Sequence, residues 1–494
     1  MKNTRTKLTA AAAVTIASAM MFSGCTGGKD ANTGKGKTLK CYFPSDKQQD
    51  LAKVNEKLNE MLKDKTDFSV NINFIDTTAY EERMNMNMAS KDAFDIAWVG
   101  YMNTMENCAQ KGGIAALDEL LKETPDLLES IPDYAWEQSK LDGQIYAVPN
   151  LQILADQKGV IVRKDLAEKY GLKAEDIKKT TDIEPFLEKI MRNEPNVIPF
   201  DPAYGVNSFW DYDSKTNYSA EALVLCEKDE NGKLVKDANG NPVAKFGQDL
   251  GDTYGKAKKL HEWYEKGYIR KDIATVVDTA ADYKAGKYAS FVSSIKPGLE
   301  SELQARHGME WTVYPVTKAF LGNLQAQSTM LAVGKNSKYP TDAIKFIELL
   351  NTDKDIYNLM CFGIEDVHYK KTGENRIELI ENSGYCPSAS WKFGNQFNAY
   401  LLPGQPDDVW EKTKEMNDNA EKTELDGFLF DKTNVKNIVT KLNNVVSEYK
   451  TIRQGVADPD AYWNEYKTKL YESGLQDYID EYQKQVNEFM ASKK

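Results

Sequence analysis

Residues 94–99, Phe-Asp-Ile-Ala-Trp-Val, form the stretch on which the interpretation of the chain depends. The run is short and almost wholly apolar, as is typical of a strand that is buried on both faces of a sheet. Two earlier strands are predicted at residues 39–43 and 68–75. Apolar residues recur at helical spacing over residues 46–62, and a methionine-rich helical stretch starts at Thr78. This β-α-β-α-β order predicts a parallel sheet with helices on both faces.

The pattern continues beyond that unit with a mixture of helices and short strands. Residues 114–121 predict a turn followed by an amphipathic helix, and Pro125 is placed to open the next helix. Residues 142–149 predict a tight turn that leads into a short strand. A further strand is predicted at residues 159–162, and a helix from Lys164. These elements extend the α/β class over the first third of the chain.

Three stretches in this first third of the chain carry a family resemblance. They are FDIAWVGY at residues 94–101, KGGIAALDELL at residues 111–121 and DGQIYAVP at residues 142–149. All three resemble the N-terminal half of the extracellular solute-binding proteins, family 1. In that family the chain crosses into a second lobe soon after the third stretch.

The C-terminal third carries a second resemblance. FGIEDVHY at residues 362–369, DGFLFD at residues 426–431 and the helical run at residues 453–475 resemble the LplA-like branch of lipoproteins. The stretches of the first and the last third occur in the order that the family shows. They follow an N-terminus that resembles that of a lipoprotein.

The resemblance implies an α/β fold with two lobes of the periplasmic-binding-protein type. Each lobe is expected to hold a mainly parallel sheet flanked by helices, with the ligand cleft between the lobes. The implied division is discontinuous: residues 38–151 and 317–360 form lobe 1, while residues 152–316 and 361–494 form lobe 2 and a C-terminal helical region. Members of family 1 are the receptors of ABC importers. The resemblance therefore implies separate permease subunits as partners.

The N-terminus predicts export and a lipid anchor. A basic start is followed by an apolar stretch over residues 8–22, which is shorter than the ~20 residues of a permanent span. Ser23-Gly24-Cys25 then resembles a lipobox, which implies a signal peptide at residues 1–24 and a lipid on Cys25. Residues 25–37 are rich in glycine and predict a flexible tether. We therefore expect the protein on the outer face of the cytoplasmic membrane, most suitably in a Gram-positive cell.

Charge and cysteine content exclude other classes. The formal net charge is −12, and removal of the three positive charges of the predicted signal peptide leaves −15. Nucleic-acid binding needs a basic surface, so no nucleic-acid partner is expected. Besides Cys25 the chain has five cysteines, an odd number whose spacing matches no metal motif. Most of them are expected to be buried thiols.

Asp237 opens a stretch that resembles the start of a calcium-binding loop. Such a loop needs Gly at its sixth position and Glu at its twelfth, where this chain has Pro242 and Gln248. The dipeptides at residues 231–232 and 239–240 are Asn-Gly, which is typical of hairpin turns. We therefore predict hairpins and no metal.

An enzyme is the less favoured alternative. The chain has only three histidines, His261, His307 and His368, and no zinc motif, nucleophile elbow or phosphate-binding loop. No cofactor fingerprint occurs, so no cofactor is expected. Glycoside hydrolysis needs two carboxylates, and nothing among the 75 acidic residues selects a pair. A surface adhesin is a further alternative, although repeats or a sandwich pattern would be more typical of one.

Family 1 receptors mostly bind carbohydrates, which makes a sugar or oligosaccharide the expected ligand, with a peptide as the main rival. Sugars bind to aromatic platforms and to polar groups that pair with hydroxyls. We selected aromatic and polar residues at predicted strand ends and in loops as candidate ligand contacts: Tyr42, Asp46, Trp98, Tyr101, Asp156, Gln157, Trp210, Tyr212, Gln325, Gln327, Glu365, His368 and Trp391. For each of them a core or surface role stays open, and Glu365 and His368 have the alternative of fixing a loop. Binding is expected to close the lobes about their crossings.

Overall fold

The computed structural model describes residues 36–90, 94–209, 223–229, 233–276, 279–322, 324–387 and 389–493. Lys37–Lys494 form one compact unit. The buried side chains of this unit gather into two large cores and a small one, the last adjoining the second. We call the elements around the first core lobe 1 and those around the other two lobe 2. Among the described helices none is long and apolar enough to cross a membrane.

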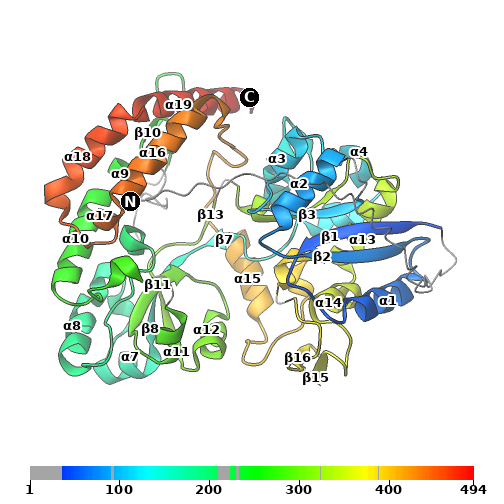
Figure 1. Cartoon of the computed structure of the whole chain (residues 1–494), viewed down its shortest axis with the longest axis horizontal. Coiled ribbons are helices and arrows are strands. Elements are labelled where there is room, and N and C mark those ends of the chain that lie inside the picture. Colours follow the sequence, from blue (N-terminus) through cyan, green and yellow to red (C-terminus); the bar gives the residue numbers. More distant parts are fainter. Residues whose placement is uncertain are drawn as a thin grey trace, which may run out of the picture. The chain divides into compact units, whose positions relative to one another are not determined.

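Lobe 1 contains a five-stranded sheet in the order β2-β1-β3-β14-β6 (Figure 1). The strands are β1 (Thr38–Pro44), β2 (Ser69–Ile75), β3 (Ile96–Gly100), β6 (Val148–Pro149) and β14 (Thr329–Val333). β1 pairs in parallel with β2 and β3, whereas β14 pairs antiparallel with β3 and β6. The three strands predicted at residues 39–43, 68–75 and 94–99 are thus confirmed as neighbours in one sheet.

Helices contribute the rest of the first core. They are α1 (Leu51–Leu62), α2 (Tyr80–Ser90), α3 (Met105–Gln110), α4 (Asp118–Leu121), α5 (Pro125–Ser130), α6 (Asp133–Gln138), α13 (Pro340–Thr352) and α14 (Lys354–Phe362). Helical spacing explains α1, because Val54, Leu58 and Leu62 share one face and are all buried. The first two predicted helices are confirmed, and both begin a few residues later than predicted.

The remaining elements predicted in the first half are also present. Pro125 opens α5, and Asp142-Gly143, both with positive φ, connects the short strands β4 (Lys140–Leu141) and β5 (Gln144–Ile145). The predicted strand at residues 159–162 lies within β8 (Lys158–Arg163), and α7 (Lys164–Tyr170) follows it directly.

The sheet of lobe 2 differs from the prediction. It has the order β11-β8-β12, with β11 (Ser290–Ser294) and β12 (Trp311–Pro315) both antiparallel to β8. The expectation of a mainly parallel sheet is therefore wrong for this lobe. β11 and β12 do run in the same direction with α12 (Leu299–His307) between them, but β8 is inserted between the two strands and faces the other way. Among the described residues of this lobe, parallel pairing takes the form of isolated bridges from residues 198 and 201 to the β11 region.

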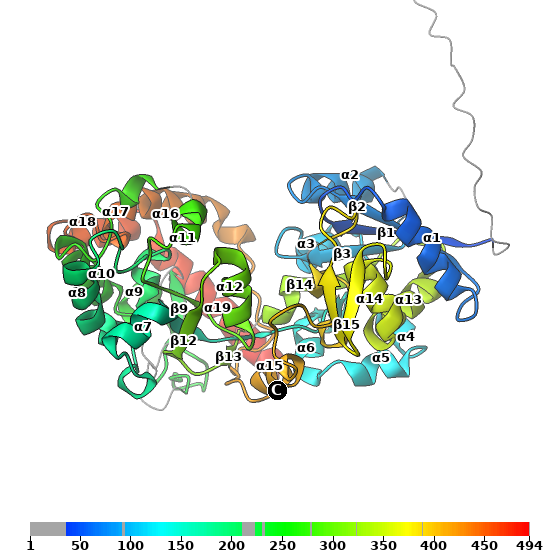
Figure 2. The same cartoon turned by 90° about the horizontal axis from the view of Figure 1, so that it is seen from below.

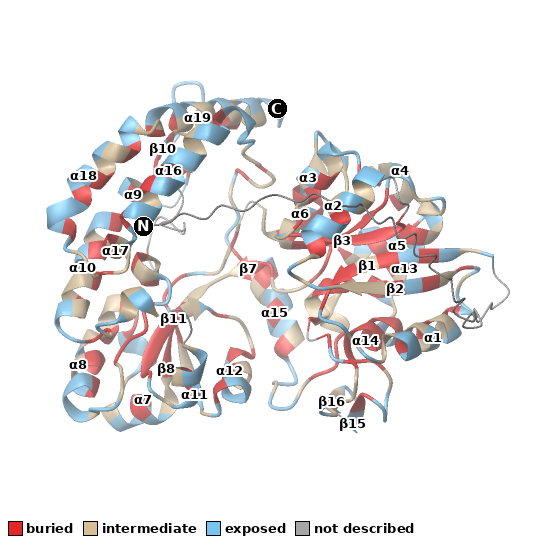
Figure 3. Ribbon diagram, in the orientation of Figure 1, coloured by how far each residue is buried: buried red, intermediate tan, exposed pale blue. Residues whose placement is uncertain are grey.

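Helices from two distant parts of the chain surround the second core (Figure 1). The earlier ones, besides α7 and α12, are α8 (Glu184–Asn193), α9 (Gly247–Leu250), α10 (Thr253–Glu265) and α11 (Ala280–Lys284), with the hairpin of β9 (Val224–Cys226) and β10 (Ala244–Phe246). The later ones are α16 (Lys436–Glu448), α17 (Lys450–Arg453), α18 (Pro459–Glu472) and α19 (Leu475–Ser492). Buried and exposed surfaces alternate around α16, α18 and α19, which cover the core with one face each (Figure 3).

The turn at Asp237 stabilises a hairpin, as predicted. Its carboxylate accepts hydrogen bonds from the backbone N–H groups of Asn239 and Asn241, at 2.8 and 2.9 Å. Gly240 has a φ of 82°, which only glycine adopts without steric cost. The other predicted turn, at residues 231–232, lies outside the described residues.

The return segment of lobe 1 is longer than the predicted residues 317–360. Most buried apolar side chains between Cys361 and Ala420 belong to the first core, although we expected residues 361–494 in lobe 2. This segment contains the hairpin β15 (Tyr369–Gly373) and β16 (Arg376–Leu379) and the helix α15 (Val409–Asp418). The second core resumes at Leu425 and Phe428. The predicted boundary falls inside α14, whose consecutive turns all bury side chains against lobe 1, so the chain cannot leave the lobe there.

Three chain segments cross between the lobes side by side. β7 (Ala155–Asp156) pairs antiparallel with β13 (Phe320–Leu321). Glu421 joins β13, because its N–H donates to Ala319 O at 2.9 Å and its carbonyl accepts from Leu321 N at 2.8 Å. Figure 1 shows β7 and β13 between the two lobes.

Asn417, in the last turn of α15, fixes the first crossing. Its side-chain oxygen accepts from the N–H groups of Leu154 and Ala155, at 2.8 and 2.9 Å, and its amide donates to Gln152 O at 2.7 Å. Asn417 is almost completely buried. One side chain thus satisfies three backbone groups at the point where the chain leaves lobe 1.

We expect Asn417→Ala to destabilise the protein by about 2–4 kcal/mol, because two buried backbone donors lose their acceptor. Chemical denaturation measures this loss. Asn419→Ala is the matched control, since that side chain is exposed two residues further on, and it should leave the unfolding midpoint unchanged. Equal effects of the two substitutions would contradict the assigned role.

Candidate ligand-binding site

An aromatic cluster lies just beyond the carboxyl end of β3. The ring of Trp98 lies 5.6 Å from Tyr101 and 6.3 Å from Trp391, and these two rings are 6.2 Å apart. Tyr101 is 61% exposed, Trp391 is half-buried and Trp98 is completely buried. Trp98 therefore supports the other two rings and has no exposed face in this structure, and its predicted ligand contact stays a prediction. Tyr101 and Trp391 form the exposed part, which we call the platform.

A buried hydroxyl holds the platform together. Thr329 Oγ1 accepts hydrogen bonds from Trp98 Nε1 at 2.7 Å and from Asn150 Nδ2 at 2.8 Å, and it donates to Trp391 O at 3.3 Å. Asn150 Nδ2 also donates to Lys392 O at 3.0 Å. Thr329, Trp98 and Asn150 are each 0% exposed, so this network is sequestered from water. The hydroxyl uses its one proton and both lone pairs, and it leaves no capacity unused.

The end of β1 approaches the same place. Lys392 Nζ donates to Pro44 O at 2.7 Å and is almost completely buried. Burial lowers the pKa of the Lys392 ammonium, while the nearby Asp46 carboxylate acts in the opposite direction. Asp46 itself is exposed directly after β1, whereas Tyr42 lies within β1 and is partly buried against the first core. Asp46 is thus near the platform, and Tyr42 belongs to the sheet.

A cavity of about 600 Å³ adjoins the platform. Trp391 lines it, together with three more aromatic residues of the return segment, Phe362, Tyr400 and Trp410. The opposite wall comes from lobe 2, where Lys296, Pro297, Glu302, Ala305 and Arg306 lie at and before α12. Its size is in the range of sites for small molecules, and its walls combine aromatic surface with a few polar groups.

Four of the predicted residues lie at the crossings or beside β14 and not at the platform. Asp156 forms an ion pair with Lys158 at 2.8 Å, and Gln157 Nε2 donates to Thr317 O at 2.8 Å. Gln325 and Gln327 lie in the short helix Gln325–Ser328, where Gln327 Nε2 donates to Gln138 O at 2.7 Å. Three of these side chains thus make structural contacts, and a ligand contact by any of the four stays a prediction.

His368 and Glu365 make contacts within their own part of the chain, and a ligand contact by either stays a prediction. His368 is buried, its Nδ1 accepts from Ile364 N at 2.8 Å, and its Nε2 lies 3.3 Å from Asp50 Oδ2. Glu365 is exposed and forms an ion pair with Lys371 at 2.9 Å. Neither side chain lines the cavity.

Three predicted residues, Cys25, Trp210 and Tyr212, lie outside the described part of the chain. The sequence analysis missed Tyr400, Trp410 and Arg306. Their stretches carry no strand-end signal, since Trp410 and Arg306 lie in helices and Tyr400 follows a short helical turn. Only the fold brings them to one cavity.

In the described part of the chain no three histidine, cysteine or acidic side chains are grouped as a metal site requires. Cys41, Cys108, Cys226 and Cys361 are buried, and none is in a disulfide. Burial raises the pKa of the Cys108 and Cys226 thiols to about 12, so both are protonated and unreactive at neutral pH.

Known proteins place this architecture in a family. The model of the bacterial extracellular solute-binding proteins matches residues 45–356, and a domain of unknown function, DUF3502, matches residues 424–491. The chain therefore belongs to the bacterial extracellular solute-binding proteins, a family of binding proteins and not of enzymes. The second match covers two of the C-terminal stretches that resemble LplA-like lipoproteins.

Individual relatives agree with this assignment. A carbohydrate ABC transporter substrate-binding protein of Streptococcus pneumoniae serotype 4 is 27% identical over 474 residues, which are 94% of each chain. The polygalacturonan/rhamnogalacturonan-binding protein YtcQ of Bacillus subtilis is 21% identical over 330 residues, 63% of each chain.

Solved structures confirm the fold. The crystal structure of the N-glycan transport solute binding protein NgtS from Streptococcus pneumoniae has a TM-score of 0.79 at 25% identity, covering 93% of this chain and all of that one. NgtS in complex with Man1GlcNAc has a TM-score of 0.67 at 26% identity and coverages of 92% and 100%. The complex with Man5GlcNAc has a TM-score of 0.64 at 25% identity and coverages of 93% and 99%.

We expect Thr329→Val to destabilise the protein by about 2–3 kcal/mol, because two buried donors lose their acceptor while the side-chain shape is kept. Thr329→Ser keeps the hydroxyl and should retain most of that stability. Chemical denaturation gives both values, and the Trp fluorescence of the folded variants reports the disturbed packing around Trp98. Equal stability of the Val and Ser variants would contradict the role of the hydroxyl.

Proposed function

We propose that this protein is the carbohydrate-binding component of an ABC importer and that it captures an oligosaccharide at the platform and the adjoining cavity. The observation that carries the proposal is the arrangement of Tyr101 and Trp391 beside a cavity that the half-buried Trp410 also lines. Aromatic faces pack against the C–H faces of sugar rings, and the surrounding polar groups pair with hydroxyls. The relatives named for carbohydrate and N-glycan transport support the same ligand class.

Closure of the lobes accompanies binding in this proposal. The protein resembles the NgtS structure named without a ligand more closely than either oligosaccharide complex, with TM-scores of 0.79 against 0.67 and 0.64. Identity and coverage are nearly the same in all three comparisons, so the difference supports a change of conformation between them. The three adjacent crossings offer short segments about which such a change takes place.

The lipid anchor completes the proposal. A diacylglycerol on Cys25 supplies two chains, enough for stable membrane attachment where one chain binds only reversibly. The tether of residues 25–37 then keeps the lobes near separate permease subunits, with no contact to nucleic acid.

Binding is tested first with a thermal-shift screen of the chain from Thr26, using Man1GlcNAc, Man5GlcNAc, oligogalacturonides and short peptides. A ligand at 100 times its dissociation constant stabilises the folded state by about 2.7 kcal/mol, which raises the unfolding temperature measurably. We expect a shift with at least one glycan and its loss in Trp391→Ala. A shift with peptides alone would overturn the carbohydrate assignment.

The platform variants need a matched control. Tyr101→Ala removes an exposed ring and should weaken glycan binding about tenfold or more without lowering stability. Tyr462→Ala removes a similarly exposed ring from α18 in lobe 2, away from the cavity, and should bind like the unchanged protein. Isothermal titration calorimetry compares the two.

Cys25→Ser tests the anchor, because a serine at this position cannot carry the thioether-linked lipid. We expect the variant to appear in the culture medium, whereas Cys386→Ser, which alters an exposed cysteine of the return segment, stays with the membrane fraction. Cell fractionation with immunoblotting measures the distribution. Membrane retention of Cys25→Ser would show that the lipid is not the anchor.

A further inference from the structure

The wall that lobe 2 contributes to the cavity carries a charge pattern of its own. Lys296 Nζ and Glu302 Oε1 form an ion pair at 2.8 Å. Arg306 lies one helical turn beyond Glu302 on α12 and also lines the cavity. Because the lysine and the glutamate neutralise each other, the wall has one positive charge in excess, at the Arg306 guanidinium.

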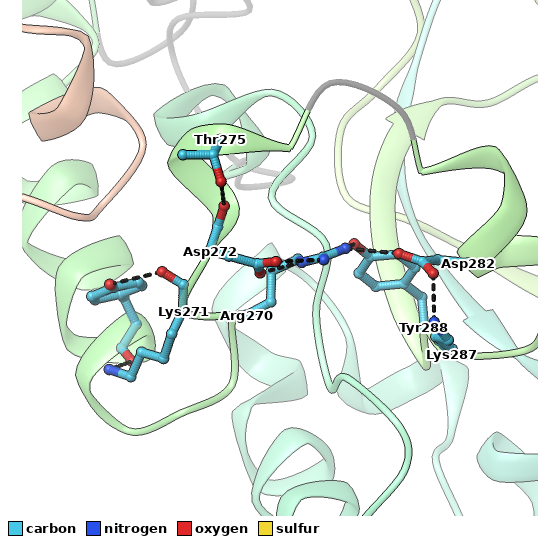
Figure 4. A network of polar contacts seen from close by, with 8 residues as sticks. Arg270, Lys271, Asp272, Thr275, Asp282, Lys287 and Tyr288 are labelled. Carbon is cyan, nitrogen blue, oxygen red and sulfur yellow. Dashed lines mark hydrogen bonds and ion pairs between the residues drawn. The ribbon is translucent and has the colours of Figure 1, made fainter.

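Arg306 differs from the arginines that serve the fold of lobe 2. Arg270 donates two hydrogen bonds to Asp272, at 2.6 and 2.8 Å, and one each to Asp282 and Tyr288, at 2.8 and 3.1 Å (Figure 4). Arg163 is likewise bonded to Asp165 and to Gly286 O. The side chain of Arg306 is exposed and has no hydrogen bond or ion pair with any other described residue. Its donors are therefore available to a ligand in the cavity.

In this structure α12 touches lobe 1 directly. The Ser301 hydroxyl donates to Gly404 O in the return segment. Arg376 holds that segment in lobe 1 through bonds to Leu402 O at 2.9 Å and Gln405 O at 2.7 Å. The aromatic wall and the Arg306 wall consequently face one cavity from different lobes.

We propose that Arg306, with the Lys296–Glu302 ion pair beside it, is the lobe 2 contact that binds adjacent oxygens of the sugar seated against Trp391. This inference rests on the proposed carbohydrate function. The planar guanidinium presents its donors in a fork, which suits two neighbouring hydroxyls or a carboxylate, and the ion pair offers a donor and an acceptor to further hydroxyls.

The contact has a consequence for closure. A ligand shifts a conformational equilibrium only through contacts that differ between the two states. Trp391 belongs to lobe 1 and Arg306 to lobe 2, so a sugar that touches both stabilises the state in which the lobes approach. Loss of Arg306 therefore removes affinity and closure together, whereas loss of an unrelated surface charge removes neither.

Arg306→Gln tests the inference on the full chain from Thr26, with whichever of Man1GlcNAc, Man5GlcNAc or an oligogalacturonide binds. We expect the dissociation constant to rise roughly tenfold or more and compaction in small-angle scattering to diminish at saturating glycan. Arg306→Lys, which keeps the charge but not the fork, should lie between. A much larger loss for the oligogalacturonide than for neutral glycans identifies a carboxylate as the bound group, and equal losses identify hydroxyls.

Arg83→Gln in α2 is the control, since this arginine is also exposed and lies away from the cavity, and it should bind and close like the unchanged protein. A dissociation constant within about twofold of that protein in Arg306→Gln, together with weaker binding in Trp391→Ala, would overturn the inference alone. Failure of the unchanged protein to bind any of the glycans would overturn the proposed function and the inference with it.

Discussion

The buried hydroxyl of Thr329 is the constraint on which the site depends. It links three chain segments that are distant in the sequence, through Trp98 of β3, Asn150 after β6 and the backbone of Trp391. In a dry interior an unpaired donor is costly, so the Thr329 hydroxyl stabilises the arrangement in which all three segments are in place. The platform is consequently a product of the completed lobe 1 core. Its rigidity, in turn, is what allows Trp391 to serve as one fixed wall of the cavity.

Predictability from the sequence follows the range of the interactions. The strands around residues 39–43 and 94–99 and the helix α1 were predictable because short-range periodicity encodes them. The burial of Trp98 was not predictable, because its position near a strand end does not show that Trp391 of the return segment covers its ring. Arg306 escaped detection for the same reason: its helix has charged residues on most sides, and only the contact with the return segment makes one side a cavity wall.

The errors in lobe assignment have one physical origin. Strand direction in lobe 2 depends on where β8 is inserted, and the length of the return segment depends on which core α14 and the following loops pack against. Both are tertiary choices that a local pattern does not record. The correction matters for function, because residues 361–420 supply Trp391, Tyr400 and Trp410. If this segment belonged to lobe 2, the aromatic and charged walls of the cavity would lie on the same lobe. A ligand that contacts both walls would then have no effect on the equilibrium between open and closed lobes.

Placing the two walls on different lobes gives the receptor its means of reporting a bound solute. The crossings are held by few bonds, among them those of Asn417, whereas each lobe has an extensive core of its own. The proposed closure concentrates motion where the packing is least, and each wall then moves with its own lobe. The platform alone would bind a sugar without changing the relation of the lobes. In the proposed function, the Arg306 donors on α12 add the second contact, so that closure depends on a solute with suitably placed oxygens.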